Sequence, residues 1–150
     1  MTESQVTPAA AAQRIDVRGP RFGATVTTVV LLLVLATGSG WLLAAQALVF
    51  AIGAFAGLRR APYGLLFARL VRPRLGPPSA FEDEAPPRFA QGVGLAFAVV
   101  GVVGYLAGVP ALGITATALA LVAAFLNAAF GFCLGCEMYL LLVRVRGRAA

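Results

Sequence analysis

Two cysteines near the C-terminal end are the residues with the clearest capacity for chemistry. They lie three positions apart in the segment Gly-Phe-Cys-Leu-Gly-Cys, residues 131–136, and the chain has no other cysteine. On a helix, residues three apart share one face, so Cys133 and Cys136 can share a proton, a metal ion or, after local adjustment, a disulfide. Cys-x-x-Cys is the spacing of dithiol redox motifs and of half a zinc site. We expect Gly131 and Gly135 to loosen the helix around the pair.

Glu137 follows the cysteine pair directly. It lies four residues after Cys133, so on a helix its carboxylate is placed to accept a proton from that thiol. The same negative charge would raise the pKa of a neighbouring thiol and slow attack by its thiolate. The competing interpretation is an interfacial carboxylate paired with Arg144 or with a loop arginine.

The thiols have three interpretations. They can form a redox or sulfur-carrying dithiol, because both cysteines of the chain fall in one motif. They can be small buried side chains that let helices pack closely in lipid. They can bind a metal, but two thiolates and Glu137 supply at most three ligands, so a fourth would come from a second chain or from water. No pattern in the chain predicts a cofactor.

The rest of the chain has the composition of a protein dissolved in lipid. Of its 150 residues, 60% are hydrophobic and 12% are charged, whereas soluble domains carry about a quarter charged residues. This excludes a cytosolic enzyme, a nucleic-acid-binding domain and a disordered chain. Histidine is absent and all twelve basic residues are arginine, so there is no imidazole to bind metal or to titrate near neutral pH.

Two long uncharged runs, residues 23–58 and 89–136, must contain the membrane-spanning segments. One crossing needs about 20 residues, so each run is too long for a single helix, and each has a breaker near its middle: Gly38-Ser39-Gly40 and Gly108-Val109-Pro110. The sequence therefore predicts an all-α, polytopic membrane protein with two helical hairpins. The four transmembrane helices are expected near residues 22–38, 41–58, 90–108 and 112–132, followed by a basic interfacial tail.

The arginines fall in three blocks, at residues 14–21, 59–88 and 144–148, and the turns between paired helices carry no charge. By the positive-inside rule, both termini and the middle loop are expected in the cytoplasm, in a cell (inner) membrane. Membrane lipids are the expected partners of the arginines, rather than nucleic acid. Residues 1–13 are predicted to be a disordered tail, and residues 14–150 a single membrane domain. Residues 63–73 are predicted to form a short interfacial helix.

A weak internal repeat runs through the chain. Pro-Arg-Phe precedes the first predicted helix at residues 20–22 and the third at residues 87–89. Ala-Phe recurs near the ends of the second and fourth, at residues 54–55 and 129–130. Each unit would be a hairpin followed by a basic segment, the two being related by an axis along the membrane normal. Chance similarity in apolar sequence is the alternative.

Three segments resemble a known family: IDVRGPRF (residues 15–22), GLRRAPY (57–63) and, above all, GFCLGC (131–136). The family consists of small bacterial integral membrane proteins of unknown function, frequent in actinobacteria, and the resemblance covers residues 14–146. Members are often encoded beside thioredoxin-like or rhodanese-type sulfurtransferase proteins. The resemblance thus implies sulfur or redox chemistry with Cys133 and Cys136 as the functional residues.

We therefore expect a membrane protein whose cytoplasmic-side dithiol exchanges disulfides or sulfur with a soluble thioredoxin-like or sulfurtransferase protein. Order along the chain suggests Cys133 as the attacking thiol and Cys136 as the resolving one. The alternatives are a non-enzymatic membrane scaffold or subunit whose cysteines pack, and a metal site shared between chains. The sequence does not determine the oligomeric state.

Overall fold

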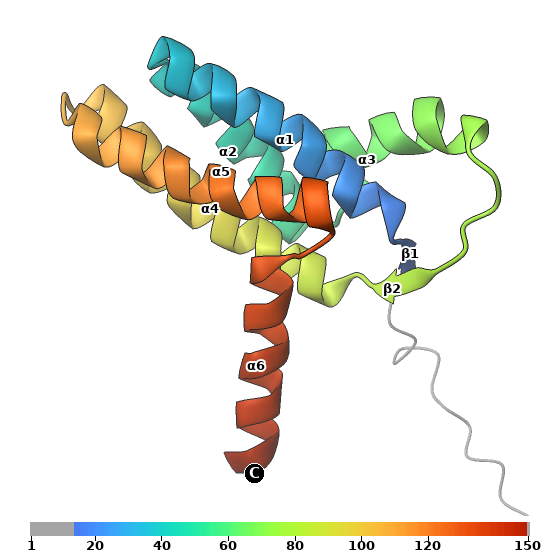
Figure 1. Cartoon of the computed structure of the whole chain (residues 1–150). Coiled ribbons are helices and arrows are strands. Elements are labelled where there is room, and N and C mark those ends of the chain that lie inside the picture. The colour runs from blue at the N-terminus through green and yellow to red at the C-terminus, as the bar shows by residue number, and fades with distance from the viewer. Residues whose placement is uncertain (1–13, 150) are drawn as a thin grey trace, which may run out of the picture.

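The computed structural model describes residues 14–149, and the predicted disordered tail of residues 1–13 lies outside them. In this part of the chain the main elements are four long helices (Figure 1). They are α1 (Arg18–Thr37), α2 (Gly40–Phe55), α4 (Ala85–Leu106) and α5 (Pro110–Phe130). A fifth long helix, α6 (Leu134–Ala149), points away from this bundle instead of running along it (Figure 1).

The two predicted breakers form the turns between the paired helices. Gly38 ends α1 with a φ of 65°, and the Ser39 hydroxyl caps α2 by accepting the Leu42 backbone N–H. Gly108, with a φ of 78°, separates α4 from α5, and Pro110 occupies the first turn of α5. A positive φ strongly favours glycine, and proline lacks the N–H that a helix start leaves unpaired.

The four bundle helices begin one to five residues earlier than predicted and end one to three residues earlier. The early starts have a simple cause, since the first turns of α1 and α4 contain prolines and arginines. The sequence assigned these residues to the flanks. Proline is tolerated in a first turn, where its missing N–H costs nothing.

Helices from the two halves of the chain pack against each other, α2 with α4 and α1 with α5. Within the second half, α4 also packs against α5. The shared core of the four helices contains Leu31, Val34, Leu43, Phe50, Ala98 and Ala120. Helices α4 and α5 approach each other closely at Gly104, where an added Cβ would lie 2.5 Å from the Gly113 nitrogen. Small residues permit this approach of two backbones.

Three of the bundle helices, α1, α4 and α5, are long and apolar enough to cross a membrane. They carry large apolar side chains on their outer surfaces, among them Leu33, Val103 and Val122. Outward leucines and valines at this density suit a lipid environment, which indicates a membrane protein. Helix α2 is also apolar but has 16 residues, or about 24 Å at 1.5 Å per residue.

Two arginines connect the two halves of the chain by hydrogen bonds at one end of the bundle. Arg21 of α1 donates two hydrogen bonds, each of 3.1 Å, to the last turn of α5. Arg88 of α4 donates three hydrogen bonds of 3.0 to 3.2 Å to the last turn of α2. The acceptors are the carbonyl oxygens of Ala128 and Ala129 in α5, and of Ala54 and Phe55 in α2.

The middle segment contains a short helical stretch, as predicted, and a small sheet that was not predicted. The stretch comprises α3 (Pro62–Leu66), the π-helical turn η2 (Phe67–Val71) and the 3-10 turn η3 (Arg72–Arg74). Strand β2 (Phe81–Asp83) then pairs in antiparallel fashion with β1 (Arg14–Asp16). Three-residue strands are too short to show an alternating pattern in the sequence.

Candidate functional site

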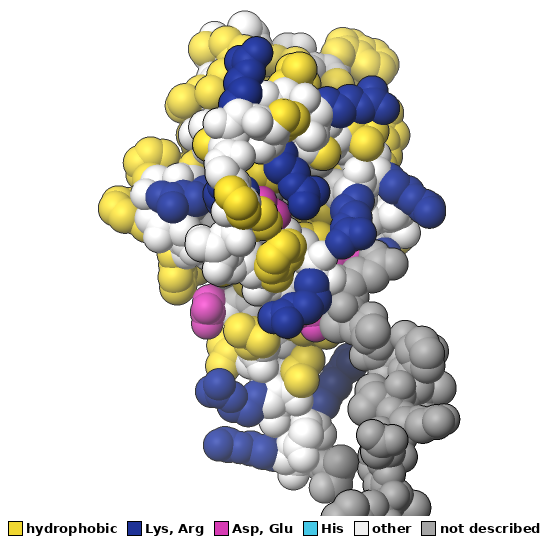
Figure 2. Space-filling model, turned by 90° about the vertical axis from the view of Figure 1, so that its right-hand side faces the viewer, with side chains coloured by type: hydrophobic (Ala, Val, Ile, Leu, Met, Phe, Trp, Pro, Cys, Tyr) yellow, Lys and Arg dark blue, Asp and Glu magenta, His cyan; other side chains and the backbone are white. Residues whose placement is uncertain are grey.

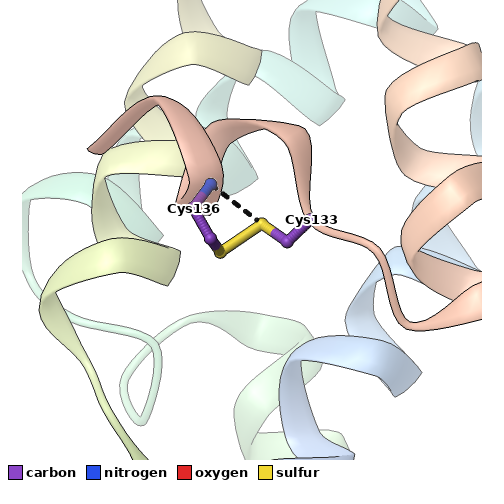
Figure 3. Close-up of a disulfide and its surroundings, with 2 residues drawn as sticks. All are labelled: Cys133 and Cys136. Atoms are coloured by element: carbon purple, nitrogen blue, oxygen red, sulfur yellow. Dashed lines mark hydrogen bonds between the residues drawn. A yellow bond between two sulfur atoms is a disulfide. The ribbon is translucent and has the colours of Figure 1, made fainter. Parts of the chain in front are cut away.

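Cys133 and Cys136 lie where α5 ends and α6 begins. Gly131 ends α5 with a φ of 67°, and residues 131–133 form a short non-helical linker before α6. The structure joins the two cysteines in a disulfide with a Cα–Cα distance of 5.2 Å (Figure 3), within the usual range of about 4.4–6.8 Å. Both cysteines are half-buried.

The spacing had suggested that the two cysteines share one face of a helix. The structure does not place both of them in a helix. Cys133 precedes α6, and Cys136 lies in its first turn. The Cys136 backbone N–H donates to the Cys133 sulfur at 3.2 Å, as the dashed line in Figure 3 shows. A side chain that accepts from the third residue of a helix occupies the N-cap position. The Cys133 sulfur therefore lies at the positive end of the helix dipole.

Gly135 fixes the start of α6 against α4. A Cβ added at Gly135 would lie 2.6 Å from both the Cα and the Cβ of Ala90, so a larger residue would push the helices apart. Nearby, the rings of Phe89 and Tyr139 pack with centroids 5.7 Å apart. The sequence had suggested that Gly135 loosens the helix. In the structure, Gly135 instead permits close packing of α6 against α4. Gly131 does supply the predicted break.

Glu137 lies in the first turn of α6, where a negative charge stabilises a helix N-terminus. Its backbone N–H donates to the Cys133 carbonyl oxygen at 3.1 Å, while its side chain is exposed. Within residues 14–149, the ion pair that the structure contains joins Arg18 to Asp16 at 2.8 Å. The pairing of Glu137 with Arg144 is therefore not formed.

The described residues bring no third metal ligand to the cysteines. No group of three or more His, Cys, Asp or Glu side chains in this part of the chain is placed to hold a metal ion. A metal bound by the two thiolates would need its remaining ligands from water or from another chain.

Arg21 is a site residue that the sequence analysis did not identify. It holds the end of α5 two residues before the linker to Cys133. The disulfide segment is thus anchored on both sides, to α1 through Arg21 and to α4 through the contact of Gly135 with Ala90. The repeated Pro-Arg-Phe was the signal in the sequence, but its partner in α5 is distant along the chain.

Glu84 is a second residue whose role the sequence analysis did not identify. It is 3% exposed, and its Oε1 accepts the Leu58 backbone N–H at 2.8 Å. Gly57, with a φ of 102°, leaves the space that this carboxylate fills. This hydrogen bond from a backbone N–H to a buried carboxylate holds the chain in place just after the end of α2.

Comparison with known proteins identifies a family without an assigned activity. A family model described as "Domain of unknown function (DUF4395)" matches residues 15–144. No curated protein and no solved structure matches the chain.

Proposed function

The chain belongs to the DUF4395 family of unknown function, and from the geometry of its cysteines we propose that it is a membrane-bound thiol–disulfide exchange protein. Its partner in this proposal is a soluble thioredoxin-like or sulfurtransferase protein. The observation that carries the proposal is the half-buried Cys133–Cys136 disulfide at the start of α6, where the chain leaves the four-helix bundle. A dithiol can exchange only where a partner's sulfur can approach it in line.

The exchange reaction is balanced by the partner's own thiols. A thiolate of the reduced partner attacks one sulfur of the Cys133–Cys136 disulfide, forming a mixed disulfide and releasing the other cysteine as a thiolate. The partner's second thiolate then attacks the mixed disulfide. The partner leaves with a disulfide, and Cys133 and Cys136 are reduced and take up the two protons. The reverse sequence oxidises this chain.

Sulfur transfer uses the same two residues. A partner persulfide would pass its outer sulfur to the Cys133 thiolate, forming a Cys133 persulfide and leaving the partner's thiol. Attack by Cys136 would release the carried sulfur as hydrosulfide and form the intramolecular disulfide.

Cys133 is the nucleophile in this scheme. As the N-cap of α6 its sulfur accepts a backbone N–H and lies at the positive end of the helix dipole, and both effects favour the thiolate. Exposed Glu137 opposes them by its negative charge, and in the proposal it accepts the proton that the Cys133 thiol releases.

In this proposal the site lies on the cytoplasmic side of a four-helix membrane domain. The arginine caps bring the start of α1 to the end of α5, and the start of α4 to the end of α2. The three arginine blocks therefore gather at one end, and the uncharged turns lie at the other. With α2 crossing as well, by local thinning or lateral packing, all the arginines face the cytoplasm.

Helix α6 is proposed to lie along the membrane surface. Leu134, Met138, Leu141 and Val145 share one face and are 37–64% exposed, and three arginines follow in its second half. Apolar residues combined with arginines suit the boundary between acyl chains and anionic headgroups. The disulfide would then lie just at the interface, within reach of a soluble protein.

Trapping of a mixed disulfide tests the proposal. The Cys136→Ala variant, expressed as the full chain in a bacterial membrane, retains Cys133 but cannot resolve a mixed disulfide. We expect it to accumulate a covalent complex that reductant dissolves, and mass spectrometry to identify a thioredoxin-like or sulfurtransferase partner. The Cys133→Ala variant should trap much less, because it lacks the N-cap thiol. Equal trapping by both would contradict the assignment of Cys133, and no complex from either would favour the scaffold alternative.

A further inference from the structure

A cavity of about 380 Å³ lies at the arginine-bearing end of the bundle, and neither cysteine lines it. Residues from the start of α1, the end of α2, the α3–η2 segment and β1 form its walls. It extends from Gly19 to Thr27 along α1, which is about 12 Å of helix. Its volume falls in the range of sites that bind small molecules, about 300–1,000 Å³.

Two polar residues that line the cavity, Thr27 and Tyr63, share a hydrogen-bond network with Gln46, which lies behind the wall. Gln46 of α2 is 1% exposed, and burying an amide without partners is costly. The Tyr63 hydroxyl donates to its Oε1 at 2.5 Å, and its Nε2 donates to the Thr27 hydroxyl at 3.5 Å. Burial raises the pKa of Tyr63, which keeps this hydroxyl protonated as a donor.

Thr27 retains an unused donor in this wall. Other threonine hydroxyls on α1 and α5 donate to the carbonyl four residues earlier: those of Thr25, Thr28, Thr37, Thr115 and Thr117. Thr27 is 5% exposed, lines the cavity and accepts from Gln46, but its hydroxyl proton has no acceptor within residues 14–149. A buried donor without an acceptor is costly unless a ligand or water supplies one.

Gln91 of α4 adds a second polar group to the same cavity. Its amide lies against Gly53, where an added Cβ would be 2.8 Å from the Gln91 Oε1. Gly53 therefore leaves the space that the amide occupies. Among the described residues the Gln91 side chain has no hydrogen-bond partner, and it lines the cavity.

The mouth of the cavity is cationic. Arg14, Arg59 and Arg72 line it together with one carboxylate, Asp16, which is already paired with Arg18. Arg59 is held in place by donating to the Arg14 carbonyl oxygen. Figure 2 shows arginine side chains spread across this side of the molecule, with few acidic side chains among them. Among the described residues, the mouth thus carries three arginines and one carboxylate, so its charge is positive.

We propose that this cavity binds a small amphipathic anion. Its carboxylate, sulfonate or phosphate lies among the mouth arginines, which favour such groups through paired N–H donors. Its apolar body contacts Val49 and Phe67, and an oxygen at its far end accepts the Thr27 proton. A soluble organic anion and an acidic lipid headgroup share this chemistry, and the test below distinguishes them. The site is separate from the cysteines and does not depend on their proposed role.

Binding of 6-hydroxy-2-naphthoate tests the site, because this probe carries a carboxylate and a hydroxyl at opposite ends of an apolar body. The full chain in phosphatidylcholine nanodiscs would be titrated by calorimetry, with empty nanodiscs as the blank. We expect saturable binding, weakened at least tenfold for 2-naphthol, which lacks the carboxylate, and several-fold for 2-naphthoate, which lacks the hydroxyl. Equal signals from all three probes, or none above the blank, would overturn the proposal.

Matched variants locate the probe. Arg72→Gln should weaken binding about tenfold, a loss of about 1.4 kcal/mol, whereas Arg74→Gln removes an exposed charge outside the cavity and should leave affinity unchanged. Thr27→Val should abolish the preference for the hydroxylated probe while retaining carboxylate binding. Equal losses in both arginine variants would show general surface attraction instead of a site. Competition by phosphatidylglycerol in the nanodiscs would identify a lipid headgroup as the occupant, and its absence a soluble anion.

Discussion

Arg21 and Arg88 make the same contact in exchanged positions: each starts a helix in one half of the chain and caps a helix of the other half. The last turn of a helix leaves carbonyl oxygens without partners, and a guanidinium supplies both donors and a charge that opposes the helix dipole. The two halves are thus joined reciprocally. The repeated Pro-Arg-Phe of the sequence corresponds to a repeated interaction, and the rotation about the membrane normal that relates the two units stays a prediction.

Replacing Arg21 and Arg88 one at a time should show that both stabilise the fold and that only Arg21 affects the reactivity of the disulfide. Arg21→Ala and Arg88→Ala each remove charged hydrogen bonds and should lower the free energy of unfolding by about 1–2 kcal/mol. Arg21 alone holds the segment before Cys133, so only Arg21→Ala should change the rate of disulfide reduction by dithiothreitol. Thermal unfolding in detergent and thiol titration measure the two effects. Similar reduction rates in both variants would show that the α5 cap does not position the disulfide.

Gly135→Leu should displace the start of α6 from α4. An added Cβ meets Ala90 at 2.6 Å, and such overpacking costs about 1–3 kcal/mol. Gly147→Leu is the matched control in the same helix, because its Cβ would meet nothing within 4 Å. We expect a lower unfolding temperature and faster thiol exchange for Gly135→Leu only. Unchanged behaviour of Gly135→Leu would mean that this contact does not hold α6.

Accessibility of the thiols distinguishes exchange from packing. A membrane-impermeant maleimide added to inside-out vesicles should label Cys133 or Cys136, and mild oxidant should block the labelling reversibly. The cytoplasm keeps thiols reduced, so labelling should occur without added reductant in fresh vesicles. Thiols that react only after unfolding in detergent would support the scaffold alternative. Protection by zinc that a chelator reverses would support the metal site shared between chains.

Acid should weaken the junction between β1 and α1. The side chain and backbone N–H of Arg18 lower the pKa of Asp16 from its ordinary 3.8. A carboxyl whose pKa is lower in the folded than in the unfolded state stabilises the fold at pH values above its unfolded-state pKa. This stabilisation is lost as the pH falls through the folded-state pKa. Asp16→Asn should therefore reduce the unfolding temperature at neutral pH and have little further effect at about pH 2. A difference between the two proteins that is the same at both pH values would contradict this role.

The arginine distribution predicts on which side of the membrane the middle loop and the C-terminus lie. A reporter fused after Ala150, and another inserted between Pro78 and Ser79, should both report the cytoplasm. A third inserted next to Gly108, in the uncharged turn before α5, should report the opposite side. If the Ala150 and Pro78 reporters lie on different sides, α4 and α5 do not both cross, and the four-crossing arrangement is wrong.

The sequence predicted those features that depend on local chemistry. Glycine and proline set the turns at Gly38 and Gly108, and the apolar runs gave the helices of the bundle. The sites that it missed depend on contacts between distant segments. The Cys133 N-cap required knowing that α6 begins at residue 134, and the network of Gln46, Tyr63 and Thr27 joins three elements. Gln46, an isolated glutamine within an apolar run, was the feature of the sequence that could have indicated this network.

The ring closed by the disulfide is very small, since its cysteines are separated by three positions. In the chain-entropy description, a crosslink stabilises a fold by restricting the unfolded chain, and a ring of this size contributes about 2 kcal/mol against about 5 for a ring of 100 residues. Breaking the disulfide therefore increases the conformational entropy of the unfolded chain only slightly. The helices of the bundle lie outside the ring, so the oxidation state of Cys133 and Cys136 can alternate while the membrane domain stays folded.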